Sequence, residues 1–304
     1  MLQHKKHTHQ CPFCQSQSLL KFTGRDYNRN KSSKKYQLYH CQECSLEFIA
    51  NPPQNMSAYY EGNYHTIPEN YNLKKIIDSY IRQEKFKVDI LQKFKTNGTL
   101  LEIGSSTGAF AVAARAKGFD TTVIEMDANC VKFMNESLKI KAIESSNPCE
   151  AMETNQENFD VICMWHSLEH MNKPWEVIET ASKYLNKDGI LIIAAPNPEA
   201  NQIKIMNQFW PHFDFPRHLF LFPIKWITNL GVQNDLQALY ITTNDLGGIY
   251  WNRFSWAMIL SKFCFIPQLK DIFWKKCIRY SHIFSKFDDE ELKGSAYTVV
   301  MKKN

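Results

Sequence analysis

The sequence predicts an α/β protein whose main body is a doubly wound sheet of seven strands, preceded by a small N-terminal metal-binding module. Three observations lead to this prediction. A strand, a glycine turn and a helix follow one another over 99–117, an acid ends the next strand, and two Cys-x-x-Cys pairs stand within the first 50 residues. A strand–turn–helix unit of this kind opens a doubly wound sheet and places a ligand at its turn.

The central stretch is TLLEIGSSTGAF, residues 99–110. Its apolar residues predict a buried strand, its small residues a tight turn, and the alanine-rich run that follows a helix ending at Gly118. The next predicted strand, 121–126, ends on Glu125 at about 20 residues beyond the turn, where an acid suits the two hydroxyls of a ribose. On this stretch alone, a turn that binds another nucleotide is the alternative.

EIGSSTG resembles the E/D-x-G-x-G-x-G signature of class I S-adenosylmethionine (SAM)-dependent methyltransferases. The resemblance implies that Glu125 binds the ribose, while the acid and glycines of the turn surround the methionine part of SAM. Ser106 stands where the family has its middle glycine, and because serine is small we expect a tighter pocket rather than a lost one. The full set of expected SAM-binding residues is Glu102, Gly104, Ser105, Ser106, Gly108, Glu125, Met126, Trp165 and His166.

The other strands are predicted over 141–144, 159–165, 190–195, 238–243 and 295–301. The fourth continues into FDVICMWHSLEH, which resembles the FD-x-x-x-x-W/x-H-x-LEH stretch of the same methyltransferases. That resemblance implies that Trp165 and His166 line the cofactor and substrate cleft. His170 is the weaker candidate, with a capping or packing role as its alternative. The family's Gly-Asp pair is missing after the third strand, so the adenine contact is unassigned.

The segment after the fifth strand, Phe209–Leu219, is crowded with aromatic residues and histidines. It resembles the family's PRHL…F segment, which covers the active site. Loop histidines that face a strand-end cleft suit acid–base work, so we expect His218 to act on the acceptor, with His166 second and Arg217 beside them. The alternative is that Arg217 and His218 form a structural clasp.

The first 50 residues predict a zinc-ribbon module. Four thiolates in two Cys-x-x-Cys pairs are typical of one structural Zn²⁺, and a redox role is the minor alternative because there are two pairs. The 26 residues between the pairs predict a β-hairpin with a polar tip. The following stretch, 45–65, resembles the segment that opens a bacterial group of zinc-ribbon methyltransferases. The expected metal ligands are Cys11, Cys14, Cys41 and Cys44.

These assignments divide the chain into a zinc-ribbon module over 1–66, a linker and lid helix over 67–96, and a class I methyltransferase domain over 97–304. Apolar residues at helical spacing over 73–94 predict the lid helix, packed on the sheet edge ahead of the first strand. A helical insert is expected over 248–287. Its aromatic and aliphatic residues favour a substrate-side wall or a homodimer face, with a membrane-surface helix as the alternative.

Composition limits the setting in which the chain works. The start is polar, no run of 18 apolar residues occurs, and the cysteine count of nine is odd, so we expect a cytoplasmic protein with no transmembrane span. The formal net charge is +5, and residues 1–50, with eight Lys and Arg against three acids, carry all of it. The basic module suits an anionic partner, while a solvated lysine loop is an equal alternative.

The resemblance therefore implies SAM-dependent methyl transfer, and we expect a small-molecule or sugar-type acceptor, such as a nucleotide-linked sugar or another anionic compound. One alternative is an RNA methyltransferase that uses the basic zinc ribbon, although residues 51–304 are formally neutral and an NPPY-like motif is missing after the fourth strand. A second is a non-enzymatic SAM-fold scaffold, against which the intact motifs argue. The sequence identifies neither the acceptor nor the methylated atom.

Overall fold

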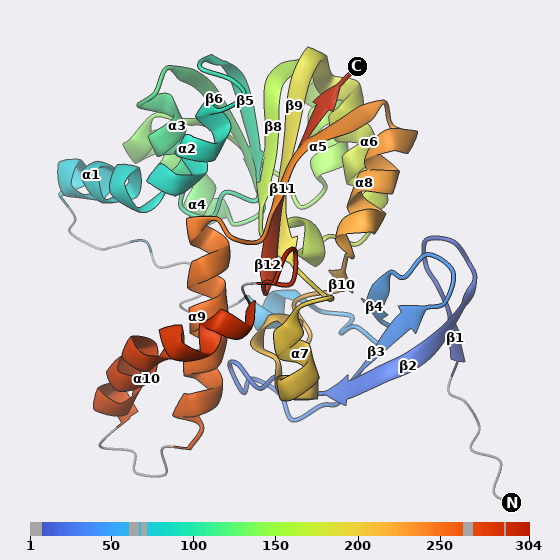
Figure 1. Ribbon diagram of the computed structural model, residues 1–304. Coiled ribbons are helices and arrows are strands. Elements are labelled where there is room, and N and C mark those ends of the chain that lie inside the picture. Colours follow the sequence, from blue (N-terminus) through green and yellow to red (C-terminus); the bar gives the residue numbers. More distant parts are fainter. Residues whose placement is uncertain (1–7, 61–66, 68–71, 264–269, 289) are drawn as a thin grey trace, which may run out of the picture.

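The computed structural model describes residues 8–60, 67, 72–263, 270–288 and 290–304. A seven-stranded mixed sheet runs through the centre of the larger part of the molecule, with helices on both faces (Figure 1). This arrangement confirms the predicted α/β fold. In spatial order the strands are β11 (Leu236–Thr242), β12 (Ala296–Lys303), β9 (Leu185–Pro196), β8 (Phe159–Trp165), β5 (Gly98–Ile103), β6 (Phe119–Glu125) and β7 (Lys141–Glu144).

Strand β5 lies at the point where the order of the sheet reverses, since it pairs in parallel with both β6 and β8. The crevice outside the carboxyl ends of such strands is where doubly wound sheets bind ligands. On the far side, β12 runs antiparallel to both β9 and β11. The glycine turn after β5 and the Trp-His pair after β8 therefore meet at one edge of the sheet.

Alternating residues of the strands bury the two faces of the sheet against different helices. Leu101 and Ile162 face the side covered by α5, α6 and α8, while Leu100 and Val161 face α2 and α3. Helices α1 and α4 pack beyond α3 on that second side (Figure 1). The bounds are α1 (Leu73–Gln83), α2 (Lys85–Gln92), α3 (Ala109–Arg115), α4 (Ala128–Phe133), α5 (Pro148–Asn155), α6 (Pro174–Tyr184) and α8 (Ile224–Gln233).

The predicted lid helix is two helices, because the chain leaves helical geometry at Glu84, which has φ −91° and ψ 3°. Helix α1 begins after Asn72, whose side chain accepts a hydrogen bond from the Lys75 amide. It packs on the α3–α4 layer, whereas α2 buries Val88 and Leu91 on the sheet. The predicted linker lies almost entirely outside the described residues, as does Tyr64.

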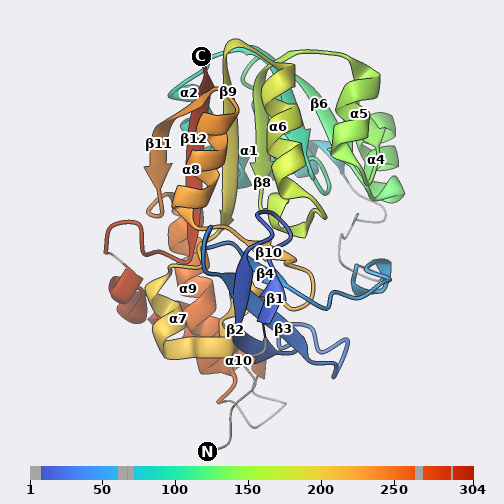
Figure 2. The same ribbon diagram turned by 90° about the vertical axis from the view of Figure 1, so that its right-hand side faces the viewer.

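The N-terminal module forms a second, antiparallel sheet that lies below the carboxyl edge of the first (Figure 2). Its strands are β1 (Thr8–Gln10), β2 (Gln17–Gly24), β3 (Tyr36–Cys41) and β4 (Glu47–Ile49), and β2 and β3 form the predicted hairpin. The fifth strand, β10 (Phe220–Leu221), comes from the PRHL segment and pairs with β4. The sequence did not predict this strand, which joins the module to the methyl-transfer part of the chain.

The expected insert contains α9 (Leu246–Ser261) and α10 (Lys270–Phe284), followed by a short helix, η7 (Ser285–Asp288). Asp245 caps α9 by accepting from the Gly248 amide at 2.7 Å, and its other oxygen accepts from Thr298 on β12. Large apolar side chains of both helices are exposed, so a dimer face and a membrane-surface helix stay predictions. Across the described residues, no helix combines the length and the apolar character that crossing a membrane requires.

Candidate active site

The turn after β5 can only be built with glycine at its first position. Gly104 has φ +78°, and a Cβ there would lie 2.5 Å from the Cβ of Ser167. The Ser167 hydroxyl in turn donates to the Ile103 carbonyl at 2.7 Å. The turn is therefore packed directly against the segment that follows β8, and its backbone is left open to a ligand on the other side.

Glu125, at the end of β6, holds the same turn from the neighbouring strand. One carboxylate oxygen accepts from the Ser106 amide at 2.7 Å, and the other accepts from the amides of Met126 and Asp127 at 2.8 and 3.0 Å. Ser106 has φ +54°, a conformation that suits the glycine of the family signature. In this structure the carboxylate fixes the distance between the two strand ends that a nucleoside would bridge.

Glu102 precedes the turn at the end of β5, and Gly108 ends the turn where α3 begins. Glu102 is buried and accepts from the Ser105 hydroxyl at 2.7 Å, and burial raises the pKa of its carboxyl group to about 7. Gly108 has φ +81°, and a Cβ there would meet the sulfur of Met134 at 2.7 Å. Met126, by contrast, is half exposed beside the turn.

A cavity of about 390 Å³ lies at the carboxyl end of β8, beside β9 and β12. Trp165 and His166 line it from the end of β8, Lys87 lines it from α2, and Tyr250 and Trp251 line it from α9. The indole of Trp165 packs edge-on against Phe110, with the Lys87 ammonium 5.3 Å from the centre of its ring. Helix α9 thus forms one wall of the cavity, as the substrate-side alternative for the insert predicts.

Three histidines surround one buried carboxylate next to the cavity. Glu169 is fully buried, with the Nδ1 of His166 at 3.6 Å and the Nε2 of His218 at 3.9 Å from one of its oxygens. The rings of His170 and His218 pack edge to face at 4.8 Å. Burial opposes ionisation of Glu169, but the histidines around it hold the pKa of its carboxyl group at about 2. Burial lowers the pKa of His170 to about 4, so its ring is neutral at pH 7.

Arg217 is fully buried and does not line the cavity. Its guanidinium donates to Asp214, three residues earlier, and to Asp26 in the module, with closest distances of 2.7 and 3.0 Å. Burial alone would raise the pKa of Asp214, yet the hydrogen bond from Arg217 holds it well below its ordinary range. Arg217 therefore has the contacts of a structural clasp. Its ion pair with Asp26 connects the PRHL segment to the tip of the hairpin.

The four predicted cysteines come together in the module. The sulfur atoms lie 3.7 Å apart for Cys11 and Cys44, 3.4 Å for Cys14 and Cys41, and 3.5 Å for Cys14 and Cys44. Four thiolates bound tetrahedrally to Zn²⁺ at about 2.3 Å would be about 3.8 Å apart, so the donor set and its spacing fit that ion.

A family model described as a methyltransferase domain matches residues 77–241, which is more than half of the chain. The chain belongs to this methyltransferase family. It is an enzyme of the SAM-dependent class I type, as the sequence motifs predicted. The matched residues include the glycine turn, Glu125 and the histidines around Glu169, but neither the cysteine module nor helices α9 and α10.

Solved structures with similar folds include a protein from Galdieria sulphuraria assigned as a sarcosine dimethylglycine methyltransferase, with a TM-score of 0.50 and 13% identity over 74% of this chain and 86% of that one. The cyclopropane synthase MmaA2 from Mycobacterium tuberculosis has a TM-score of 0.49 and 15% identity, covering 73% and 84%. No curated protein sequence matches the chain. At 13% identity the likeness to the Galdieria sulphuraria protein supports the fold alone.

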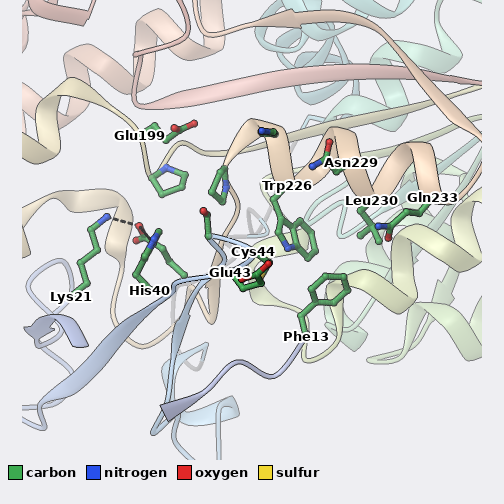
Figure 3. Close-up of a pocket in the computed structure, with 15 residues that line it drawn as sticks. Phe13, Lys21, His40, Glu43, Cys44, Glu199, Trp226, Asn229, Leu230 and Gln233 are labelled. Carbon is green, nitrogen blue, oxygen red and sulfur yellow. Dashed lines mark hydrogen bonds and ion pairs between the residues drawn. The ribbon is translucent and has the colours of Figure 1, made fainter. Parts of the chain in front are cut away.

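A second cavity, of about 490 Å³, lies between the zinc-ribbon module and α8 of the methyltransferase (Figure 3). Phe13 and Lys21 line it from the module, and Trp226 lines it from α8. None of its lining residues belongs to the glycine turn or to the end of β8. It is therefore separate from the first cavity.

Sequence reasoning did not find two parts of the methyltransferase site. Glu169 lies within the WHSLEH motif, but its role was not predicted. The histidines three residues before it and one residue after it were a usable signal. Sequence reasoning also left Trp251 inside the insert, where no local pattern shows that its ring contacts His166 edge to face at 5.4 Å. Asp26 gave no signal, since it stands in a polar hairpin tip.

Proposed function

We propose that this methyltransferase transfers the methyl group of SAM to a small-molecule or sugar-type acceptor held in the cavity beside Trp165 and His166. The cavity is the observation that carries the proposal. Its volume of about 390 Å³ suits a small ligand, and its lining combines aromatic rings with a few polar groups. His166 stands next to Ser167, whose side chain packs on Gly104, so an acceptor in the cavity is adjacent to the SAM turn.

Bound SAM supplies a methyl group that its sulfonium makes electrophilic. The chain must therefore hold SAM, align the acceptor, exclude water and remove a proton where the acceptor carries one. The glycine turn with Glu102 and Ser105 holds the methionine part, while Glu125 and Met126 lie on the ribose side. Both glycines of the turn have positive φ, and Ser167 and Met134 occupy the space that their Cβ atoms would take, so the tight turn that the cofactor needs is present.

His166 takes the proton of the acceptor. Its ring lines the cavity, and Glu169 lies 3.6 Å from its Nδ1, where a carboxylate stabilises the imidazolium that forms. His218 ranks first from sequence, but here its side chain is only 11% exposed and faces Glu169 from outside the cavity lining. Arg217 acts as a positioning residue, since its guanidinium is held by Asp26 and Asp214.

The cysteine cluster holds one structural Zn²⁺. Four protein thiolates fill a tetrahedral site, so no position is open for substrate, and the ion stabilises a module that is small for independent folding. Thiolate ligation requires a reducing compartment, which favours the cytoplasm.

The test is transfer of labelled methyl from SAM to a panel of nucleotide sugars and small hydroxyl and amine compounds. We expect label in the low-molecular-mass fraction with the wild type and a roughly 10²–10⁴-fold lower rate in His166→Gln, with SAM affinity unchanged by calorimetry. His40→Gln, a matched histidine variant in the module, should keep both. Label that enters only RNA or protein would contradict the proposed acceptor class, and full activity of His166→Gln would remove the assigned base.

A further inference from the structure

We propose that Glu169, His170 and His218 bind one divalent first-row transition-metal ion behind His166, the histidine that lines the acceptor cavity. This site is separate from the cysteine cluster. The inference rests on the proposed function only for the role of the ion, because the geometry of the three ligands stands by itself.

The three residues converge although they come from two distant segments. Glu169 and His170 lie on the short helix η3 (Leu168–His170), and His218 lies in the PRHL segment before β10. One ligand atom from each residue lies within 4.8 Å of the other two. Ligands bound to a common ion at about 2.1 Å are about 3.0–3.5 Å apart, so a movement of roughly 1 Å closes the site.

Glu169 is a carboxylate in the interior whose nearest ion-pair partners are two histidine rings. Its side chain is 0% exposed, and neither carboxylate oxygen has a hydrogen-bond partner among the residues that the structure describes. The nearest ring nitrogens, on His166 and His218, are at 3.6 and 3.9 Å, beyond hydrogen-bond length. A buried carboxylate is ordinarily paired, hydrogen-bonded or bound to a metal, and here the hydrogen bonds are missing and the two ion pairs with histidines are long.

The two histidines are oriented as metal ligands are. The Nδ1 of His170 lies 3.0 Å from the Arg217 carbonyl, and the Nδ1 of His218 lies 2.8 Å from the His212 carbonyl. Because a carbonyl oxygen only accepts, each ring donates its Nδ1 proton and leaves the lone pair on Nε2. A backbone carbonyl behind the ring is the usual outer shell of a metal-binding histidine.

The donor set indicates the kind of ion. Two imidazoles and one carboxylate suit Zn²⁺, Mn²⁺ or Fe²⁺, whereas Ca²⁺ and Mg²⁺ prefer oxygen ligands alone. Three protein ligands leave positions open, as in catalytic rather than structural sites. An ion there would fix Glu169 behind His166, the residue that lines the cavity and takes the proton of the acceptor.

A second buried glutamate provides a comparison within the same chain. Glu47 is 97% buried, but Lys21 forms an ion pair with it and His40 lies 3.5 Å away. The lysine balances the charge of Glu47, and only one histidine is near. Glu47 therefore needs no metal ion, and variants of His40 are matched controls for variants at Glu169.

The experiment is a titration of the full-length, zinc-loaded protein with Mn²⁺, after dialysis against metal-free buffer, with free Mn²⁺ counted by electron paramagnetic resonance. Thiolate sites bind Mn²⁺ poorly, so the cysteine cluster contributes little signal. We expect one Mn²⁺ per chain. Affinity should fall at least about 100-fold in Glu169→Gln and in His218→Asn, and it should be unchanged in His40→Gln.

Mn²⁺ that does not bind to the wild type, or that binds equally well to both ligand variants, would overturn the proposal. If Glu169→Gln does not fold, as judged by its melting curve, His218→Asn decides. Calorimetry with SAM on the same samples separates this inference from the proposed function. SAM binding without Mn²⁺ binding refutes the metal site alone, whereas Mn²⁺ binding without SAM binding refutes the methyl-transfer role alone.

Discussion

The SAM end and the acceptor end of the cleft are assembled in opposite ways. At the SAM end, Gly104, Ser106 and Glu125 belong to one strand–turn–helix–strand unit, and their contacts cross only 19 residues of chain. At the acceptor end, Glu169 follows β8 and lies near His218, which comes after β9 in the chain. Trp251 lines the same cavity as His166 from α9. The first end depends on local geometry, and the second depends on how distant segments pack.

Within the part of the chain that the structure describes, the N-terminal module contacts the proposed acceptor end. Its β4 pairs with β10, Asp26 binds Arg217, and the Tyr60 hydroxyl lies 3.1 Å from His170. The hydrogen bonds of the glycine turn come instead from β6 and from the segment after β8. We therefore expect damage to the module to spread to the acceptor end and to spare SAM binding. The following predictions test this division, from the largest expected effect to the smallest.

Removal of the metal from the cysteine cluster should have the largest effect. Zinc ligation contributes on the order of 10 kcal/mol to folding of small zinc modules, so Cys41→Ser should unfold β2–β4 locally. SAM affinity, measured by calorimetry, should change by less than about threefold. Zinc analysis is the control, with about one ion per chain in the wild type. A loss of SAM binding in proportion to metal loss would break the division between the two ends.

Arg217→Met should lower the free energy of unfolding by about 3–5 kcal/mol, because it leaves two buried or half-buried carboxylates without their cation. Urea denaturation measures this loss. Lys183→Met removes an exposed ion pair with Glu179 and should leave the urea midpoint unchanged within error. A loss below about 1 kcal/mol in Arg217→Met would mean that the clasp does not hold the PRHL segment.

Glu125→Ala should weaken SAM binding by about 1–3 kcal/mol, since it removes the acceptor for the ribose and for three turn amides. The acceptor end should be undisturbed, so Mn²⁺ affinity should match the wild type. Calorimetry with SAM and with its demethylated product is the measurement. Unchanged binding would show that the end of β6 does not contact the nucleoside.

The raised pKa of the Glu102 carboxyl group predicts how SAM affinity depends on pH. Burial raises the pKa of its carboxyl group to about 7, so free enzyme below that pH binds a proton that a cationic ligand must displace. Affinity should therefore rise about tenfold from pH 6 to pH 8 and then level off. Glu102→Gln supplies the control curve, in which only the ionisation of SAM itself remains. Parallel curves for the two proteins would refute this role of Glu102.

The same difference explains how much could be predicted from sequence. The turn, the acid after β6 and the two Cys-x-x-Cys pairs are local patterns, and the structure places each where the pattern indicates. Strand β10 has two residues and no periodicity, so nothing in the sequence shows that it pairs with β4. Arg217 illustrates the same limit: its partner Asp26 lies 191 residues earlier, and only packing brings the two together.

The central claim is that the module holds the acceptor end independently of the SAM end. Its most direct test is amide hydrogen exchange in Asp26→Asn, which weakens the clasp while keeping the size of the side chain. The amide of Leu219 donates to the Glu169 carbonyl, and the amide of Ile49 donates to the Leu219 carbonyl. Both amides should exchange at least tenfold faster than in the wild type. The Gly104 and Ser106 amides should keep their rates, and SAM should bind as before. Equal acceleration at both ends, or none at Leu219 and Ile49, would contradict the account.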